Sequence, residues 1–217
     1  MCGRYVRKSP STSYADLFGV SMPDLPASFN IAPTQPVLAV RATDGAVEGA
    51  VLRWGLIPSW AKDHKAAQIN ARGETLADKP MFRTAFRKRR CLIVADGYFE
   101  WQKLDAKRKQ PFFIHAKGEP IAFAGLWERW HGPDGPVESC AIITTDANEL
   151  SRQVYDRMPV ILPRIAQAAW LDHSIEDPRA LQELIRPFDP AAMGLHPVAA
   201  SVGNVKNNSP ELIEPAA

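Results

Sequence analysis

The sequence predicts an α+β fold, in which an antiparallel or mixed β-sheet carries a few peripheral helices. Short runs rich in Val, Ile and aromatic residues recur along the chain and are bounded by Gly, Pro or Asp, as strands usually are. Helical segments are fewer, and the strict alternation of strands and helices that builds a doubly wound parallel sheet is missing. The length of 217 residues fits one domain or two and allows a sizeable core.

The first predicted element is a helix over residues 11–19. Ser13 and Asp16 resemble a capping box, and Gly19 is a typical C-terminal stop. After a Pro-rich loop, the sequence predicts strands at residues 36–41, 50–57, 91–101, 111–116, 121–127, 139–145 and 159–162. Further helices are predicted at residues 79–90, 164–172 and 177–188.

The composition is ordinary for a soluble globular protein, with 46% hydrophobic and 23% charged residues. The net charge of +2 is too small to indicate a partner by itself. No apolar run approaches the roughly 18 residues of a membrane-spanning helix, and the N-terminus lacks the apolar region of a signal peptide. We therefore expect a cytoplasmic protein that does not enter a membrane.

The three cysteines, Cys2, Cys91 and Cys140, are odd in number and widely spaced, which argues against a disulfide framework and a zinc motif. Cys91 and Cys140 lie in strand-like runs, where we expect them to be buried. None of the five histidines has metal-ligand spacing to another. The sequence thus predicts a reducing compartment, no metal site and no cofactor.

Cys2 directly follows the initiator Met1. Removal of Met1 would leave an α-amine and a thiol on one residue, and such a 1,2-aminothiol reacts with aldehydes. The amine condenses to an imine, and the thiol then closes a thiazolidine ring. Because the α-amino pKa is about 7.7–8.0, a useful fraction of the amine is unprotonated at neutral pH. The alternative is that Cys2 has no chemical role and occupies a variable position.

Two tryptophans precede a row of polar residues. We expect Trp54 to pack in the core, whereas Trp60 follows a Pro-Ser turn and, if exposed, offers a stacking platform for a nucleobase. In an extended segment, Asn70, Arg72 and Glu74 share one face. That face is either a solvated edge or the lining of a polar cleft.

Residues 79–90 carry six basic residues and no acidic one: Lys79, Arg83, Arg87, Lys88, Arg89 and Arg90. One interpretation is a solvated helical face, with Phe82 and Phe86 packed on the core. The other is a stripe that binds phosphate groups, the sequence-independent part of nucleic-acid affinity.

Glu100 lies between Phe99 and Trp101 in a strand-like run, and alternation places Tyr98 and Gln102 on the same face as Glu100. A carboxylate among aromatic rings tends to have a raised pKa, because desolvation disfavours the charged form. Such a group suits general acid–base catalysis. The alternative is the exposed polar face of a half-buried strand.

Several stretches of the chain, in their order, resemble one family: the SOS-response-associated peptidase (SRAP) domain of abasic-site processing proteins. The matching stretches are MCGRY, FNIAPTQ, RWGLIPSW, INARGET, RRCLIVADGYFEW, DRMP and VGNVKNNSPELIEP. They span almost the whole chain. The resemblance therefore implies a single SRAP domain over residues 1–217, with a mixed, barrel-like sheet.

The resemblance implies a sensor of abasic sites in single-stranded DNA. The processed Cys2 would form a covalent thiazolidine crosslink that shields the lesion during replication. Weak lyase activity by β-elimination and self-removal of Met1 are also implied. We expect a monomer that works on the nucleoid.

The resemblance also implies roles for single residues. Cys2 supplies the amine and the thiol, Asn70 holds the lesion sugar or the amine, and Glu100 protonates the departing sugar oxygen. The residues expected to contact DNA are Gly3, Arg4, Trp60, Arg72 and Arg157.

Tyr155 departs from the family pattern. The family has His-x-Arg-Met-Pro at this point, and Tyr155 occupies the histidine position. A tyrosine has a pKa near 10, whereas a histidine has a pKa near 6.5. A tyrosine is therefore a poorer proton shuttle at pH 7 than a histidine. We therefore expect crosslinking to survive, while sugar-ring opening, β-elimination and reversal become slower.

Two other functions fit parts of the sequence. In an N-terminal-nucleophile cysteine amidohydrolase, Cys2 would attack an amide and its own amine would act as the base. In a non-covalent single-strand-binding module with impaired chemistry, Trp60 and the basic residues would supply the whole affinity.

Overall fold

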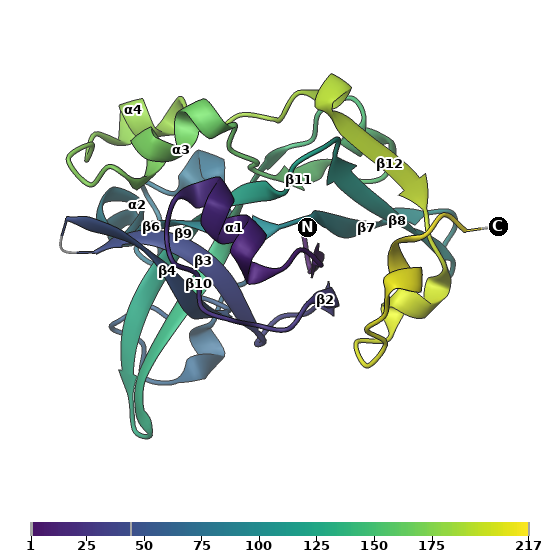
Figure 1. Ribbon diagram of the computed structural model, residues 1–217. Helices are drawn as coiled ribbons and strands as arrows, with labels where there is room; N and C mark the ends of the chain where they lie inside the picture. Colours follow the sequence, from purple (N-terminus) through teal and green to yellow (C-terminus); the bar gives the residue numbers. More distant parts are fainter. Residues whose placement is uncertain (1, 44, 217) are drawn as a thin grey trace.

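The structure is a computed structural model that describes residues 2–43 and 45–216. Its centre is a closed barrel made of β3 (Pro36–Thr43), β4 (Ala46–Trp54), β6 (Arg90–Ala95), β9 (Ile121–Gly132) and β10 (Gly135–Asp146) (Figure 1). The strands follow the order β10, β4, β3, β6, β9, and β9 pairs again with β10 to close the ring. All these pairings are antiparallel except the parallel contact between β4 and β10.

A second, antiparallel sheet stands beside the barrel. In spatial order it contains β12 (Met193–Pro197), β8 (Lys109–Ala116), β7 (Gly97–Lys103), β1 (Arg4–Arg7) and β2 (Ser28–Ile31). Asp96 alone separates β6 from β7, so the predicted single strand over residues 91–101 is wrong. The chain turns there because the Asp96 carboxylate accepts hydrogen bonds from the Lys8 and Ser9 N–H groups and from the hydroxyls of Ser9 and Tyr14.

Two short strands flank β10 beyond the closed part of the barrel. β5 (Asn70–Arg72) runs parallel to β10, and β11 (Arg157–Pro159) runs antiparallel to it. Thr144 of β10 pairs with both Arg72 and Pro159, so the two short strands occupy its two edges. This arrangement brings the INARGET and DRMP segments together from distant parts of the sequence.

The helices cover the outer wall of the barrel. They are α1 (Ser11–Phe18), α2 (Arg83–Lys88), α3 (Arg164–Leu171) and α4 (Pro178–Gln182). On β6, Cys91 and Ile93 pack in the barrel interior, whereas Leu92 and Val94 pack outside with the buried faces of the helices. The predicted fold class is confirmed, with antiparallel and mixed strands at the centre and helices at the periphery.

Several helices are shorter than predicted. The basic segment forms turns before α2 and passes into β6 at Arg90, and α4 ends at Gln182. The expected capping box of α1 is wrong: Pro10 occupies the N-cap position, with no side-chain hydrogen bond to the helix. Gly19 ends α1 in the left-handed conformation, with φ at 67°, as predicted. Within residues 2–43 and 45–216, no helix combines the length and apolarity needed to cross a membrane.

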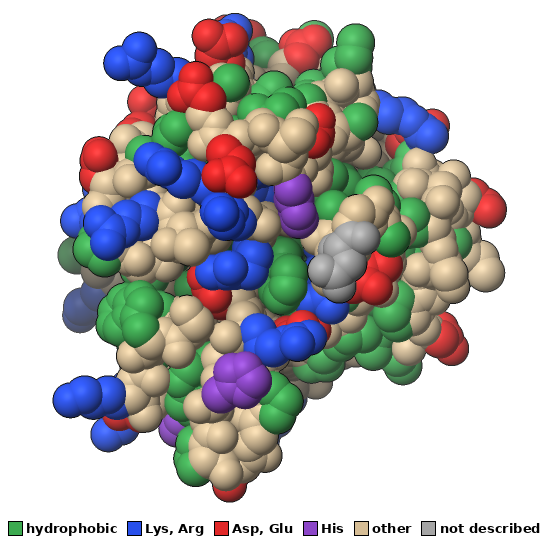
Figure 2. All heavy atoms as spheres, turned by 90° about the vertical axis from the view of Figure 1, so that its left-hand side faces the viewer, with side chains coloured by type: hydrophobic (Ala, Val, Ile, Leu, Met, Phe, Trp, Pro, Cys, Tyr) green, Lys and Arg blue, Asp and Glu red, His purple; other side chains and the backbone are tan. Residues whose placement is uncertain are grey.

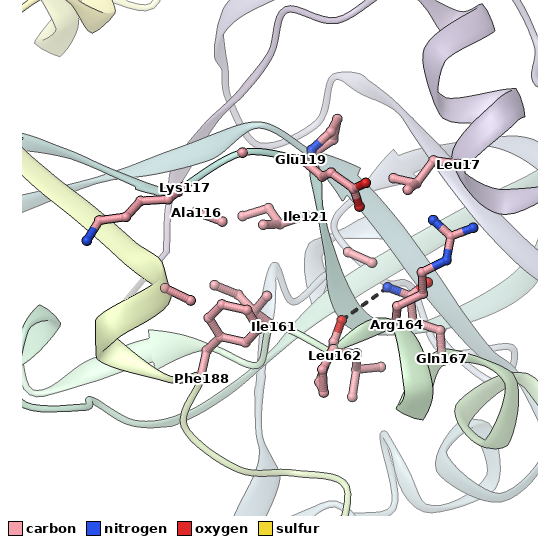
Figure 3. Close-up of a pocket in the computed structure, with 15 residues that line it drawn as sticks. Leu17, Ala116, Lys117, Glu119, Ile121, Ile161, Leu162, Arg164, Gln167 and Phe188 are labelled. Carbon is pink, nitrogen blue, oxygen red and sulfur yellow. Dashed lines mark hydrogen bonds between the residues drawn. The ribbon is translucent and has the colours of Figure 1, made fainter.

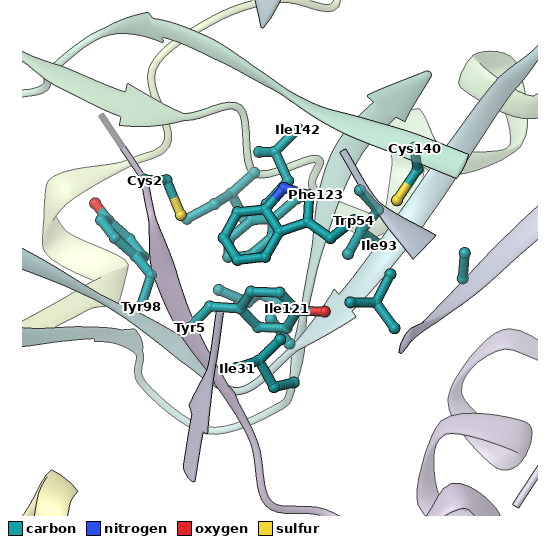
Figure 4. Packing of buried hydrophobic residues seen from close by; sticks show 14 of the residues in the cluster. Cys2, Tyr5, Ile31, Trp54, Ile93, Tyr98, Ile121, Phe123, Cys140 and Ile142 are labelled. Atoms are coloured by element: carbon teal, nitrogen blue, oxygen red, sulfur yellow. The ribbon is translucent and has the colours of Figure 1, made fainter. Parts of the chain in front are cut away.

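Aromatic side chains fill the end of the barrel that faces the second sheet (Figure 4). The Tyr5 ring of β1 packs edge-on against Trp54 and Phe123, with ring centroids 5.3 and 5.8 Å apart. Tyr98 of β7 packs edge-on against Phe123 at 6.1 Å. Each such pair contributes about 0.5–1.5 kcal/mol beyond area burial. These contacts anchor β1, and with it the adjacent Cys2, at the barrel end.

Candidate active site

Cys2 lies at the end of the barrel and is fully buried. Its side chain packs in the same cluster as Trp54, Tyr98 and Ile142, and Figure 4 shows its sulfur near the Tyr98 ring. Burial raises the pKa of the Cys2 thiol well above its ordinary value, and the charge of Glu100 shifts the pKa in the same direction. The group is therefore a protonated thiol at neutral pH.

Asn70 holds the backbone of Cys2. Its Nδ2 donates a hydrogen bond to the Cys2 carbonyl oxygen at 2.8 Å. Asn70 itself is positioned by β5, which pairs with Ile142 of β10, and by the Trp54 indole, which donates to the Ile69 carbonyl oxygen at 2.9 Å. Asn70 Oδ1 is buried and has no hydrogen-bond partner among the described residues. It is an acceptor available to a bound molecule or to an amine.

Glu100 of β7 is buried, with 5% of its surface exposed, so the interpretation as an exposed polar face is wrong. Burial raises the pKa of its carboxyl group, and the charge of Asp156 adds to the effect. The neighbours Tyr98 and Gln102 on the same face bond to the segment after β10. The Tyr98 hydroxyl lies 3.1 Å from Ser151 Oγ, and Gln102 Nε2 donates to a main-chain carbonyl oxygen at 2.7 Å.

Tyr155 follows that same segment, the 3₁₀ turn Ser151–Gln153, and precedes β11. Its side chain is 37% exposed. Its N–H donates to the Ser151 carbonyl oxygen at 3.0 Å. Tyr98, which shares the face of β7 that carries Glu100, in turn bonds to the Ser151 hydroxyl.

The three arginines expected to bind phosphates differ in how strongly they are already bonded. Arg4 donates to Asn30 Oδ1 at 2.7 Å and to the carbonyl oxygens of Val202 and Gly203 at 3.0 and 3.2 Å. Arg72 is exposed and has no ion pair or side-chain hydrogen bond among the described residues. Arg72 is therefore the readiest of the three to take a phosphate.

Arg157 is held by two carboxylates. Its guanidinium donates to both carboxylate oxygens of Glu74, at 2.7 and 2.9 Å, and to Asp146 at 2.7 Å. Although burial opposes the shift, the hydrogen bonds from Arg157 lower the pKa of Glu74. Glu74 lies in a 3₁₀ turn after β5, so the predicted extended row of alternating residues ends at Arg72.

Trp54 packs in the core as predicted, and the exposure of Trp60, which the sequence left open, is high. Trp54 is fully buried, and Trp60 is 62% exposed. The loop that carries Trp60 is held by Trp130, whose indole donates to the Ala61 carbonyl oxygen at 2.7 Å. Gly3 is half-buried between Cys2 and β1.

Sequence reasoning missed one structural hub near Cys2. Asn30 is buried, and its Nδ2 donates to the carbonyl oxygens of Val202, Asn204 and Asn207 at 2.9–3.2 Å. With Arg4, it ties the C-terminal VGNVKNN stretch to the strand that follows Cys2. The only available signal was the FNIAPTQ motif, which contains Asn30.

The site is separate from the cavity shown in Figure 3, which has a volume of about 340 Å³. That cavity lies between α1, the turn from β8 to β9 and the start of α3, with Ile121, Ile161 and Phe188 in its walls. None of the predicted site residues lines it. In the described part of the chain, no group of three or more His, Cys, Asp and Glu residues is placed to hold a metal ion.

Comparisons with known proteins identify the family of the chain. The family model described as SOS response associated peptidase (SRAP) matches residues 1–205. The chain is 43% identical over 222 residues to the abasic site processing protein YoqW of Bacillus subtilis (strain 168), covering 99% of each chain. It is 33% identical over 224 residues to the abasic site processing protein YedK of Escherichia coli (strain K12), covering 99% and 100%.

The fold agrees as well. A crystal structure of a protein from Bacteroides thetaiotaomicron superposes with a TM-score of 0.90, at 27% identity and with full coverage of both chains. The match of the family model over most of the chain and the identity to full-length relatives lead to one conclusion. The chain belongs to the SOS response associated peptidase (SRAP) family.

Proposed function

We propose that this protein processes abasic sites in single-stranded DNA by capturing them covalently through Cys2. The observation that carries the proposal is the bond from Asn70 Nδ2 to the Cys2 carbonyl oxygen, in a buried site that also holds Glu100. The names of the YoqW and YedK relatives support abasic sites as the target. The Cys2 amine must first be released from Met1, which lies outside the described residues.

The first bond forms between the Cys2 nitrogen and C1′ of the ring-opened deoxyribose, which is an aldehyde. The resulting carbinolamine loses its oxygen as water and becomes an imine. Glu100 supplies the proton to the departing oxygen, because a carboxyl group with a raised pKa keeps its proton at a higher pH than an ordinary glutamate. Asn70 fixes the Cys2 backbone, so that the amine meets the aldehyde in one orientation.

The second bond forms between the Cys2 sulfur and the same carbon. The thiol adds across the imine: sulfur bonds to C1′, and the thiol proton ends on nitrogen. The product is a thiazolidine, with one water released overall. The raised pKa of the thiol favours this order of events, because a protonated thiol is a weak nucleophile towards the free aldehyde, whereas it can pass its proton to the imine nitrogen as the sulfur bonds to C1′.

The imine also has a second fate. Loss of a proton from C2′ expels the 3′ phosphate by β-elimination, which is a weak lyase activity. Self-removal of Met1 would give the protein its peptidase character. Gly3, Arg4, Trp60, Arg72 and Arg157 would contact the strand. We further propose a monomer that acts on the nucleoid in the cytoplasm.

Intact-mass spectrometry tests the proposal directly. The purified protein is measured before and after incubation with a single-stranded oligonucleotide that contains one abasic site. We expect loss of Met1 and then a stable adduct with the mass of protein plus DNA minus water. Cys2→Ala keeps the amine but lacks the thiol, so it should give only an imine that borohydride reduction traps.

Other outcomes would favour other functions. Loss of Met1 with no adduct, together with equal binding of intact and abasic strands, would favour a non-covalent binding module. An acyl adduct formed on an amide substrate would favour an N-terminal-nucleophile amidohydrolase. Either result would overturn covalent capture.

A further inference from the structure

The basic segment over residues 79–90 divides into two groups of three cations. The cations of the first group form ion pairs or hydrogen bonds with other parts of the chain. Lys88 lies 3.7 Å from Glu176, and Arg89 pairs with the buried Glu128 at 2.5 Å. Arg90 is fully buried and donates to main-chain carbonyl oxygens on α2 and at the end of α3. These three residues are accounted for by the structure itself.

Lys79, Arg83 and Arg87 form the second group, which we call the α2 cation row. All three are exposed, and within residues 2–43 and 45–216 none has an ion pair or a side-chain hydrogen bond. The Lys79 carbonyl oxygen accepts the Arg83 N–H at 2.9 Å, so Lys79 lies one helical turn before Arg83. The three cations therefore follow each other at four-residue spacing on one face.

Such a row weakens the helix that carries it. Like charges four residues apart repel each other, and α2 has only six residues in which to offset that repulsion. Two other exposed arginines of the molecule are each paired with a carboxylate, Arg108 with Asp105 and Arg129 with Glu138. An unmatched row is what a polyanion-binding surface requires.

The α2 cation row lies on a different side of the barrel wall from Cys2. Phe82 and Phe86, on the apolar side of α2, pack with Leu92 outside the barrel. Cys2 packs with Cys91 and Ile93, which point inward. Figure 1 shows α2 away from the second sheet, and Figure 2, which looks onto that side, shows many Lys and Arg side chains gathered there. The row is therefore not part of the cluster that holds Cys2.

We propose that the α2 cation row is a second contact surface for the phosphate backbone of DNA, separate from the crosslinking site. A strand held at Cys2 would reach the row only by running along the outside of the barrel, so the contact adds affinity for long strands. It carries no sequence information, because phosphate contacts position a strand without reading its bases. The choice of DNA as the ligand rests on the proposed function.

The test compares two variants that lose the same charge. The first is Lys79→Gln/Arg83→Gln/Arg87→Gln, which keeps side chains that favour a helix. The matched control is Lys103→Gln/Lys107→Gln/Lys109→Gln, on the exposed hairpin between β7 and β8. The dissociation constant for a long intact single strand is measured over a series of salt concentrations. Using intact DNA makes the result independent of whether Cys2 reacts.

We expect the plot of the logarithm of the association constant against the logarithm of the salt concentration to become less steep by about 2 for the α2 variant. Each lost contact with a single strand reduces the steepness by about 0.7. The control should keep the slope of the unmodified protein. The rate of crosslinking to a short abasic oligonucleotide should be unchanged in both variants. The melting temperature of the α2 variant should not fall, because the substitutions remove repulsion between like charges.

An unchanged slope would overturn the proposal, and so would an equal loss in the control, which would indicate a general effect of net charge. Slower crosslinking to the short oligonucleotide would also count against it, because the row would then act on the Cys2 site. If no protein variant forms an adduct, the proposed crosslinking fails, whereas the salt dependence on intact DNA still decides the role of the row.

Discussion

Asn70 Nδ2 donates a hydrogen bond to the carbonyl oxygen of Cys2 at 2.8 Å, and this bond joins residues 68 positions apart in the sequence. It fixes the backbone of the residue that, in the proposed function, presents both an amine and a thiol to one carbon atom. A chain end is usually among the most mobile parts of a protein. In the proposed reaction, the bond would remove that freedom before the substrate arrives.

Asn70→Ala should slow crosslinking by roughly 2- to 12-fold, the value of one hydrogen bond of 0.5–1.5 kcal/mol. Affinity for an intact strand should be unchanged, because the bond is made within the protein. Single-turnover rates with an abasic oligonucleotide measure the first effect, and binding of the intact strand measures the second. A matching loss in both would show that Asn70 holds DNA rather than Cys2.

Glu100→Gln should slow imine formation by about 10²-fold, as removal of a positioned general acid does. The unmodified protein should show a bell-shaped pH–rate profile. The rate rises as the α-amine loses its proton and falls as the pH passes the raised pKa of Glu100. The variant should keep only the rising limb. A falling limb that persists in Glu100→Gln would assign it to another group.

The same substitution should change stability in a pH-dependent manner. A carboxyl group whose pKa is raised by folding stabilises the protein below its unfolded pKa and loses that contribution as the pH rises through the folded pKa. Glu100→Gln should therefore raise Tm relative to the unmodified protein at pH 8, by about 2–4 °C for each kcal/mol. No gain is expected at pH 4. Thermal unfolding at both pH values checks the sign.

Tyr155→His should accelerate release of the crosslink, approaching the roughly 10²-fold effect of a positioned general acid or base. A histidine titrates near pH 6.5 and can pass a proton at neutral pH, whereas a tyrosine cannot. Tyr155→Phe is the matched control and should release no faster than the unmodified protein. Release is followed as transfer of the protein from labelled to unlabelled abasic DNA. An unchanged release rate in Tyr155→His would refute the role given to this position.

Glu74→Gln/Asp146→Asn should free Arg157 for DNA. Losing both ion pairs should lower Tm by roughly 2–5 °C. The released guanidinium can then bind a phosphate of an intact strand. The slope of the logarithm of the association constant against the logarithm of the salt concentration should become steeper by about 0.7. Asp24→Asn/Glu119→Gln, which removes two exposed carboxylates that form no ion pair among the described residues, controls for net charge. If only stability changes, Arg157 acts solely as a tether that joins β11 to the end of β10 and to the 3₁₀ turn after β5.

Local patterns in the sequence predicted elements well where one physical signal dominated. The strands of the barrel followed from β-branched and aromatic runs, and the C-terminus of α1 followed from Gly19, which adopts a positive φ at little cost. The capping box of α1 failed, because the helix begins at Ser11, so Ser13 lies inside its first turn and Pro10 occupies the N-cap position. The start of α1 is instead held by bonds from the Ser9 and Tyr14 hydroxyls to Asp96, which span more than 80 residues and have no local signal.

In the candidate site, too, local patterns predicted some features and contacts between distant residues decided others. Alternation along β7 placed Tyr98, Glu100 and Gln102 on one face, but it left open whether Glu100 is exposed or buried. The pairing of β7 with β1 and β8 decided this, because it packs the strand at the end of the barrel. The burial that raises the pKa of Glu100 is thus a consequence of tertiary structure.

The sequence by itself determined the chemistry that is available: a cysteine after the initiator methionine, and the motifs that carry Asn70, Glu100 and Arg157. Only the tertiary structure decided which of these groups meet. It tethered Cys2 to Asn70, bound Arg157 to two carboxylates and placed the α2 cation row on the outer wall of the barrel. The reason is physical: residue types fix what a side chain can donate, accept or release, whereas distance and burial fix whether it does so, and both arise from contacts between distant parts of the chain.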